Sequence, residues 1–142
     1  MSGSIFLDTN VLVYAIETAG SHPHKCAAAL ALARRDDVCL STQVLGEFYR
    51  AVTSSRRARP LTHQEAVAWV QFWKRHDVRP ITVPHVDLAL ELTGRHRISY
   101  YDALILAAAH LAGCAVVCSE DLNAGQEYGT LRVENPFLPG AR

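Results

Sequence analysis

Four acidic side chains occur where the chain could bring them together for chemistry. Short apolar runs, which predict buried strands, precede two of them, Asp8 and Asp121. The other two, Glu47 and Asp102, lie near the starts of predicted helices. Ligands of parallel sheets bind beyond the carboxyl ends of the strands. We therefore expect all four carboxylates to point into one cleft.

A cleft with this set of carboxylates has a limited choice of chemistry. The negative charges would repel each other strongly unless a cation held them. Oxygen-only ligands suit Mg²⁺ or Mn²⁺ rather than zinc. Such an ion lowers the pKa of a bound water and stabilises the charge of a phosphate during its displacement. The residue types and their placement therefore predict metal-dependent hydrolysis of phosphodiesters, and nothing narrower.

Each of these side chains also has a purely structural alternative. Glu47 could pair with Arg50 three residues later on a helix. Asp102 could complete a capping box that Ser99 begins. Capping or turn formation is the alternative for the remaining residues, which are Asp8, Asn10 and Asp121. Taken singly these alternatives are favoured, and the joint placement at one end of the sheet favours a functional site.

The elements that would position these residues alternate between strands and helices. Continuous apolar runs predict strands that are buried on both faces, at residues 5–7, 38–40, 78–83, 115–118 and 131–133. Pro80 limits hydrogen bonding in the third strand and places it at a sheet edge. Strands that alternate with helices predict an α/β fold with three layers, in which helices flank a mainly parallel central sheet.

Capping residues mark the predicted helices. One helix begins near Val11, a second covers 26–35, and Ser41-Thr42 caps a third. The others are a helix opened by the capping box 62–65, a helix from Pro84 with Val86, Ala89 and Leu90 facing inward, and an apolar helix from Ser99 to about residue 112.

Length and composition suit one soluble domain. The 142 residues are 49% hydrophobic and 20% charged, with a net charge of zero. The longest apolar run, 103–109, is far shorter than the ~18 residues that span a bilayer, and no signal peptide pattern occurs at the start. We therefore expect a cytoplasmic protein without membrane contact. The four cysteines form no C-x-x-C pair, and we expect buried free thiols.

Four segments resemble the motifs of the PIN-domain family. The segment 6–10, Phe-Leu-Asp-Thr-Asn, is similar to its opening strand and D-x-N motif, and 44–48 is similar to its glutamate helix. The segment 99–105 resembles the part with its third acid, and 119–123, Ser-Glu-Asp-Leu-Asn, resembles its final turn. The order and spacing match from Ile5 to Pro136, and the short length is most similar to the VapC toxins of bacterial toxin–antitoxin pairs.

This resemblance implies a Rossmann-like PIN fold in a single domain, 1–142, with its core at about 5–136. It also implies bound Mg²⁺ or Mn²⁺, an RNA substrate, a homodimer and a VapB-like antitoxin. Metal ligation falls to Asp8, Asp102 and Asp121, and the catalytic set adds Glu47. Three polar residues would support the site, namely Asn10, Ser119 and Asn123. Ser119 replaces the commoner threonine, and Asn123 replaces an acid of some members, which leaves open whether a second ion binds.

Two clusters could make contacts outside the acidic site. The arginines Arg50, Arg56, Arg57 and Arg59 could line an RNA path, or they could be a solvated helix end. The aromatic residues Trp69, Phe72 and Trp73 could form the seam of a dimer, or they could belong to the core.

Two other functions remain alternatives. A PIN fold could bind RNA or serve as a scaffold without catalysis. An aspartate-nucleophile phosphatase would use Asp8 as its nucleophile, but Asn10 stands where such enzymes have a second acid. Only Lys25 and Lys74 could supply the lysine that these enzymes need.

Overall fold

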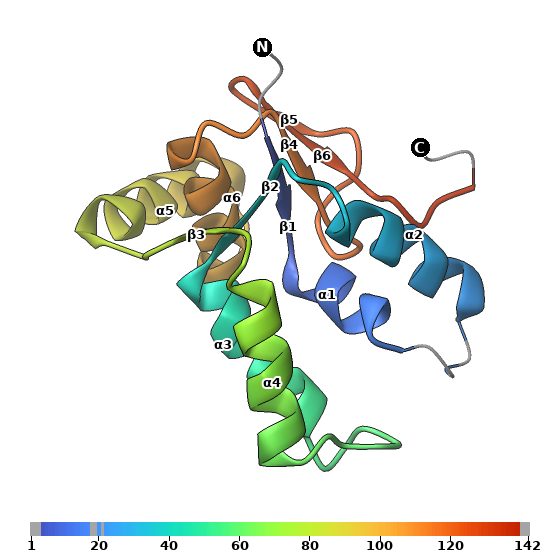
Figure 1. Cartoon of the computed structure of the whole chain (residues 1–142). Helices are drawn as coiled ribbons and strands as arrows, with labels where there is room; N and C mark the ends of the chain where they lie inside the picture. The colour runs from blue at the N-terminus through green and yellow to red at the C-terminus, as the bar shows by residue number, and fades with distance from the viewer. Residues whose placement is uncertain (1–3, 18–19, 21, 140–142) are drawn as a thin grey trace.

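A six-stranded sheet organises the chain (Figure 1). The computed structural model describes residues 4–17, 20 and 22–139. The strands are β1 (Ile5–Leu7), β2 (Val38–Ser41), β3 (Asp77–Arg79), β4 (Val116–Cys118), β5 (Glu127–Tyr128) and β6 (Leu131–Glu134). Their order is β3-β2-β1-β4-β6-β5, and every pairing is parallel except that of β5 with β6. The prediction of a mainly parallel sheet is therefore confirmed.

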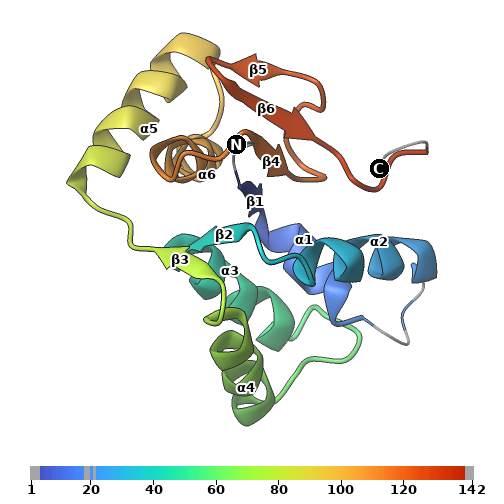
Figure 2. The same ribbon diagram turned by 45° about the horizontal axis from the view of Figure 1, so that its top comes forward.

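Helices cover both faces of this sheet (Figure 2). They are α1 (Thr9–Ala15), α2 (Pro23–Ala33), α3 (Thr42–Thr53), α4 (His63–Trp73), α5 (Val83–His96) and α6 (Tyr100–Leu111). The first four lie together on one side, and α5 packs against α6 on the other. The chain moves outward from β1 to β3 and then returns to the opposite side of β1 at β4. Because connections between parallel strands are right-handed, this reversal of direction places the later helices on the other face of the sheet.

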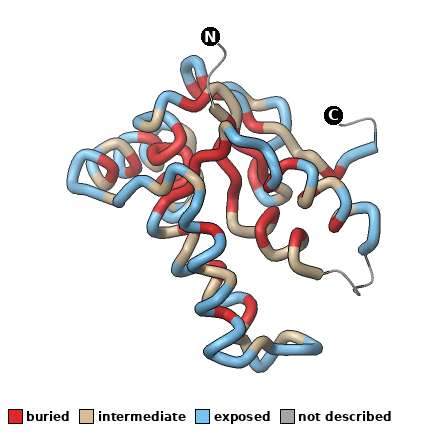
Figure 3. The backbone as a smooth tube through the Cα atoms, viewed as in Figure 1, coloured by how far each residue is buried: buried red, intermediate tan, exposed pale blue. Residues whose placement is uncertain are grey.

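The core lies along the central strands and α6 (Figure 3). Phe6, Leu7 and Leu40 are fully buried, as expected for parallel strands covered on both faces. On α6 the run 103–109 is buried throughout, and four of its seven residues are alanines. Their small side chains let this helix lie close to the sheet. The four cysteines are buried and free, as predicted.

Side-chain caps fix the starts of α3, α4 and α6. The Ser41 hydroxyl accepts the Val44 N–H at 3.3 Å and begins α3 directly after β2. Thr62 forms the predicted capping box at the start of α4, and Ser99 caps α6. These caps confirm the predicted starts, since each polar side chain satisfies a backbone donor that the first turn leaves free.

Several predicted boundaries were wrong. The third strand is shorter than 78–83 and ends before Pro80, although it does lie at the sheet edge. Both α1 and α2 begin two or three residues earlier than predicted, because Asp8 caps the first and Pro23 opens the second. The antiparallel strand β5 was not predicted, since its two residues are too few to show a pattern.

The inward face of α5 also differs from the prediction. Leu90 is 57% exposed, whereas Leu92 is only 8% exposed and belongs to the core with Ala89. The helix continues beyond Gly94 and ends where Arg97 adopts a left-handed conformation, with φ of 56°.

Among the described helices, none is both long enough and apolar enough to cross a membrane.

A pair of leucine truncations on α5 tests this register. Leu92→Ala should lower the free energy of unfolding by about 2–5 kcal/mol, because it opens a cavity in the core. Leu90→Ala, the matched control, should lower it by less than about 1 kcal/mol. Urea denaturation followed by circular dichroism measures both values. Equal losses for the two variants would contradict the observed register.

Candidate active site

The carboxyl ends of β1 and β4 meet at the centre of the sheet. The Asp8 N–H donates to the Cys118 carbonyl at 3.0 Å, and the buried Ser119 hydroxyl donates to Asp8 Oδ2 at 2.7 Å. The crossovers before β2 and after β3 lie on opposite faces, so β1 and β4 border the point where the strand order reverses. Open α/β sheets bind their ligands at such a point.

Asp8 is a buried acid with two roles. Its Oδ1 accepts the Thr9 N–H at 2.7 Å and caps α1, so the predicted capping contact is present. The pKa of Asp8 is raised to about 6, chiefly by burial and also by the negative charges of Glu47 and Asp121. The hydrogen bonds from Ser119 and Thr9 act in the opposite direction. The carboxylate is therefore ionised at neutral pH at a cost in stability.

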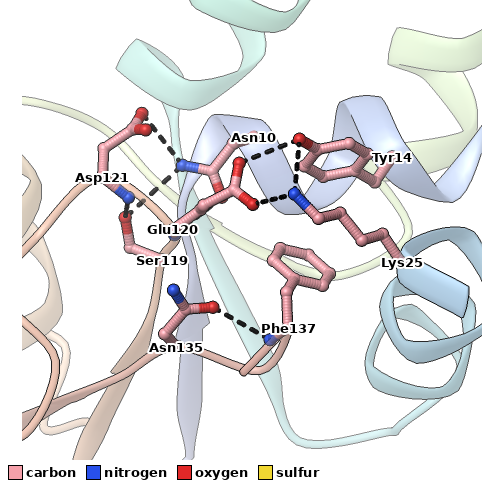
Figure 4. Close-up of polar contacts among 8 residues, drawn as sticks. All are labelled: Asn10, Tyr14, Lys25, Ser119, Glu120, Asp121, Asn135 and Phe137. Carbon is pink, nitrogen blue, oxygen red and sulfur yellow. Dashed lines mark hydrogen bonds and ion pairs between the residues drawn. The ribbon is translucent and has the colours of Figure 1, made fainter. Parts of the chain in front are cut away.

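Asn10 and Ser119 connect Asp8 with Asp121. Figure 4 shows the part of this network formed by Asn10, Ser119 and Asp121. The Asn10 amide nitrogen lies 3.2 Å from Asp121 Oδ2, 3.4 Å from the Ser119 hydroxyl and 3.5 Å from Asp8 Oδ2. The Ser119 hydroxyl also accepts the Asp121 N–H at 3.1 Å. The turn after β4 is therefore fixed to the start of α1, and both acids share one amide donor.

Glu47 joins this site through a contact that the sequence did not reveal. The Thr9 hydroxyl donates to Glu47 Oε1 at 2.7 Å, and the Gln43 amide donates to Oε2 at 3.1 Å. The alternative pairing with Arg50 is wrong, since the carboxylate turns toward α1. Gln43 precedes Glu47 by one helical turn on the same face of α3, and this spacing is the only sequence signal for their contact.

Asp102 stands at the start of α6, and among the described residues it shares no hydrogen bond with Asp8, Glu47 or Asp121. The Gln43 amide donates to the Tyr101 carbonyl at 3.2 Å and so links this helix start to Glu47. The Asp102 N–H donates to the Ser99 hydroxyl at 3.2 Å, but the reciprocal bond of a capping box is not formed within the described residues. The half-buried Asp102 carboxylate is therefore not used for capping.

The donor set of this site fits a hard cation in its chemistry. Its side chains offer oxygen ligands, and none of the ion pairs among the described residues involves Asp8, Glu47, Asp102 or Asp121. The buried charge of Asp8 thus has no cationic partner within the described part of the chain. Over the described ranges, however, no three histidine, cysteine or acidic side chains are grouped closely enough to hold one ion. Asp8 and Asp121 are the acids that share a common donor.

Neighbouring acids, by contrast, are compensated (Figure 4). Lys25 lies 2.5 Å from Glu120, which also accepts the Tyr14 hydroxyl at 2.8 Å. Burial works against ionisation of Glu120, but these two hydrogen bonds hold its pKa below the ordinary value. Lys25 is engaged in this pair, so it is not positioned as the lysine of an aspartate-nucleophile phosphatase.

The remaining predicted residues lie outside this network. Asn123 contacts Gln126 at 3.5 Å and shares no hydrogen bond with the acids of the described chain. Arg57 pairs with Glu17 at 3.5 Å, whereas Arg50 and Arg56 are exposed.

The predicted aromatic seam needs a correction. Trp73 is only 1% exposed and packs against Phe48 in the core, because the inward face of α4 turns it toward α3. Phe72 is 44% exposed, and Trp69 is half-buried.

The sequence matches the family model of the PIN domain over residues 5–126. The chain belongs to the PIN domain family. Its resemblance to this family and its α/β fold are thereby confirmed. No curated protein sequence matches the chain significantly.

Solved structures of similar PIN domains come from toxin–antitoxin systems. A toxin–antitoxin complex from Klebsiella pneumoniae is 18% identical, with a TM-score of 0.68 over 94% of this chain and 98% of that chain. VapC20 of Mycobacterium tuberculosis, described as a sarcin–ricin loop cleaving toxin, is 25% identical, with a TM-score of 0.62 over 80% and 87%. VapBC2 from Rickettsia felis, bound to a promoter DNA fragment, is 22% identical, with a TM-score of 0.63 over 92% and 97%.

The raised pKa of Asp8 predicts how stability changes with pH. Between pH 3.8 and about 6, the folded protein holds a proton on Asp8 that the unfolded chain has lost. The contribution of Asp8 to the free energy of unfolding therefore falls as pH rises through this window. Above it, Asp8→Asn should be more stable than the wild type by up to about 3 kcal/mol, and the difference should vanish toward pH 4.

Denaturation in EDTA between pH 4 and pH 7 measures this difference. Asp87→Asn, which removes an exposed carboxylate on α5, serves as the control and should show no such change. A stability difference between Asp8→Asn and the wild type that stays constant with pH would contradict the buried, destabilising charge.

Proposed function

We propose that this PIN domain is a metal-dependent endoribonuclease and the toxin of a VapBC-type toxin–antitoxin pair. The observation that carries the proposal is the set of carboxylates around the ends of β1 and β4, which has no cationic partner among the described residues. The similarity to VapC20, described as a sarcin–ricin loop cleaving toxin, supports RNA as the substrate.

We assign metal binding to Asp8, Asp102 and Asp121, with Mg²⁺ or Mn²⁺ as the ion. When bound, the ion activates a water and stabilises the charge on the scissile phosphate. Asp8 is ionised at neutral pH and, being buried, gains most from a cation. Asn10 and Ser119 orient Asp8 and Asp121 through the shared amide and hydroxyl. Asp102 brings the third carboxylate from the start of α6.

We assign Glu47 to the orientation of the attacking water. Thr9 and Gln43 occupy one lone pair on each of its oxygens, so the carboxylate has a fixed direction. A carboxylate held in this way can accept a proton from a nearby water without reorganising. Asn123 could support the outer edge of the site through its amide, although its contact in the structure is with Gln126.

Exposed arginines are suited to the RNA backbone. Arg50 and Arg56 lie on α3 and in the loop after it, and phosphate contacts supply most of the non-specific affinity for nucleic acids. We assign Arg57 a smaller role, because it pairs with Glu17 at 3.5 Å.

Partners follow from the same comparison. Several similar structures are toxin–antitoxin complexes, so we infer that a VapB-like antitoxin binds and silences this chain. We also infer a single PIN domain over 1–142 with its core at 5–136, and a place in the cytoplasm, where RNA is available.

One observation favours the alternative of an RNA-binding or scaffold module without catalysis. Within the described part of the chain, no three acids are grouped closely enough for one ion. An activity measurement decides between the two functions.

Cleavage of total cellular RNA by the purified protein tests the proposal. Discrete fragments should form with Mg²⁺ or Mn²⁺ and not with EDTA. Asp8→Asn and Asp102→Asn should each lose at least about 100-fold in rate, since even outer partners of metal ligands change activity by up to about 100-fold. Asp87→Asn, an exposed acid away from the site, should cleave like the wild type. If the metal-loaded wild type cleaves neither RNA nor DNA, the result would favour the non-catalytic module.

The oligomeric state tests the inferred homodimer. Phe72 and Val67 expose apolar surface on α4 that a second copy would cover. Light scattering at micromolar concentration should give twice the 15.6 kDa mass of one chain, and Phe72→Arg should reduce it to one. A monomeric mass for the wild type would count against the dimer.

A further inference from the structure

An open groove begins at the candidate active site and runs along α1 and α3. Asn10 and Asp121 line its inner end, and Val13, Tyr14 and Ala51 line it further out. Ala51 follows Glu47 by one turn of α3, so this helix face leads from the acids into the groove. The groove encloses about 400 Å³. A group that enters it would lie directly beside whatever the acids hold.

The charges along the groove differ from those at its inner end. Its outer acids, Glu17 and Glu120, are paired with Arg57 and Lys25. Asp121, at the inner end, has no such partner among the described residues. His22 also lines the groove. Because the outer acids are paired, this part of the groove suits an uncharged group, and the phosphate attached to that group would belong at the acids with their cation.

The Tyr14 ring is held in place as one wall of this groove (Figure 4). Its hydroxyl donates to Glu120 at 2.8 Å, and the Phe137 ring meets it edge-on at 4.9 Å between centroids. The Lys25 ammonium lies 5.0 Å from the ring centroid. A side chain fixed by three contacts loses little freedom when a ligand packs against it, so the wall is preorganised.

We propose that this groove is a subsite for one unpaired base of the RNA, next to the scissile phosphate. The proposal rests on the proposed ribonuclease function and deepens it. Single-stranded RNA is recognised largely through bases that leave the stack and pack on aromatic and apolar side chains. Tyr14, Val13 and Ala51 supply such a surface at the required place. The subsite would select for the base at one position of the cleavage site.

Ala51→Leu tests the subsite, because the larger side chain fills the groove without disturbing α3. Leucine is a good helix former, and Ala51 is exposed. Ala68→Leu on the exposed face of α4 is the matched control. When the wild type cleaves RNA of randomised sequence, we expect it to prefer particular bases at one position beside the cut. Ala51→Leu should weaken or change that preference and raise KM about tenfold, the size of one lost base contact.

Two further measurements separate the outcomes. Mn²⁺ affinity of Ala51→Leu, measured by calorimetry, should equal that of the wild type, which shows that the acids are intact. If the wild type cleaves RNA while Ala51→Leu and Ala68→Leu share its base preference and KM, the subsite is wrong and the ribonuclease stands. If metal-loaded wild type cleaves no RNA, the proposed function itself fails, and the subsite fails with it.

Discussion

The hydrogen bond from the Ser119 hydroxyl to the Asp8 carboxylate joins the ends of the two central strands. This bond offsets part of the cost of burying the Asp8 charge. The Ser119 hydroxyl oxygen also accepts hydrogen bonds from the backbone N–H groups of Asp121 and Leu122. One hydroxyl thus sets the position of a buried charge and the conformation of the following turn. The same turn positions Glu120 against Asn10, since the Glu120 N–H donates to the side-chain oxygen Oδ1 of Asn10 at 3.1 Å.

The carboxylates around this bond have two kinds of partner, basic side chains and neutral hydrogen-bond donors. Glu17 and Glu120 have basic partners, and their charge is balanced within the protein. Asp8 and Glu47 receive hydrogen bonds from neutral groups, which orient an acid without cancelling its charge. This contrast separates a centre of negative potential, which includes the buried Asp8, from neighbouring acids whose charge is balanced. A cation and an uncharged ligand group can then occupy adjacent places.

The sequence predicted the parts of the site that depend on local structure. Strand ends and caps placed Asp8, Asp121 and Asp102, because the apolar runs and capping residues that define them are contiguous. The contact of Thr9 with Glu47 joins residues 38 positions apart. It depends on how α3 packs against α1, and the nearby Arg50 offered a simpler local partner. The exposure of Leu90 had a similar origin, since α5 extends past Gly94 and its inward face is set by contact with α6.

The alanines of α6 have a consequence for how such chains diverge. Ala103, Ala107, Ala108 and Ala109 are fully buried and belong to the hydrophobic core. A larger residue at any of them would move the helix as a rigid body, and Asp102 at its start would move with it. Substitutions there are tolerated only with a matching loss of volume in the residues that face them. Sequence drift in this layer of the fold should therefore proceed by paired replacements, while the surface of the same protein changes one residue at a time.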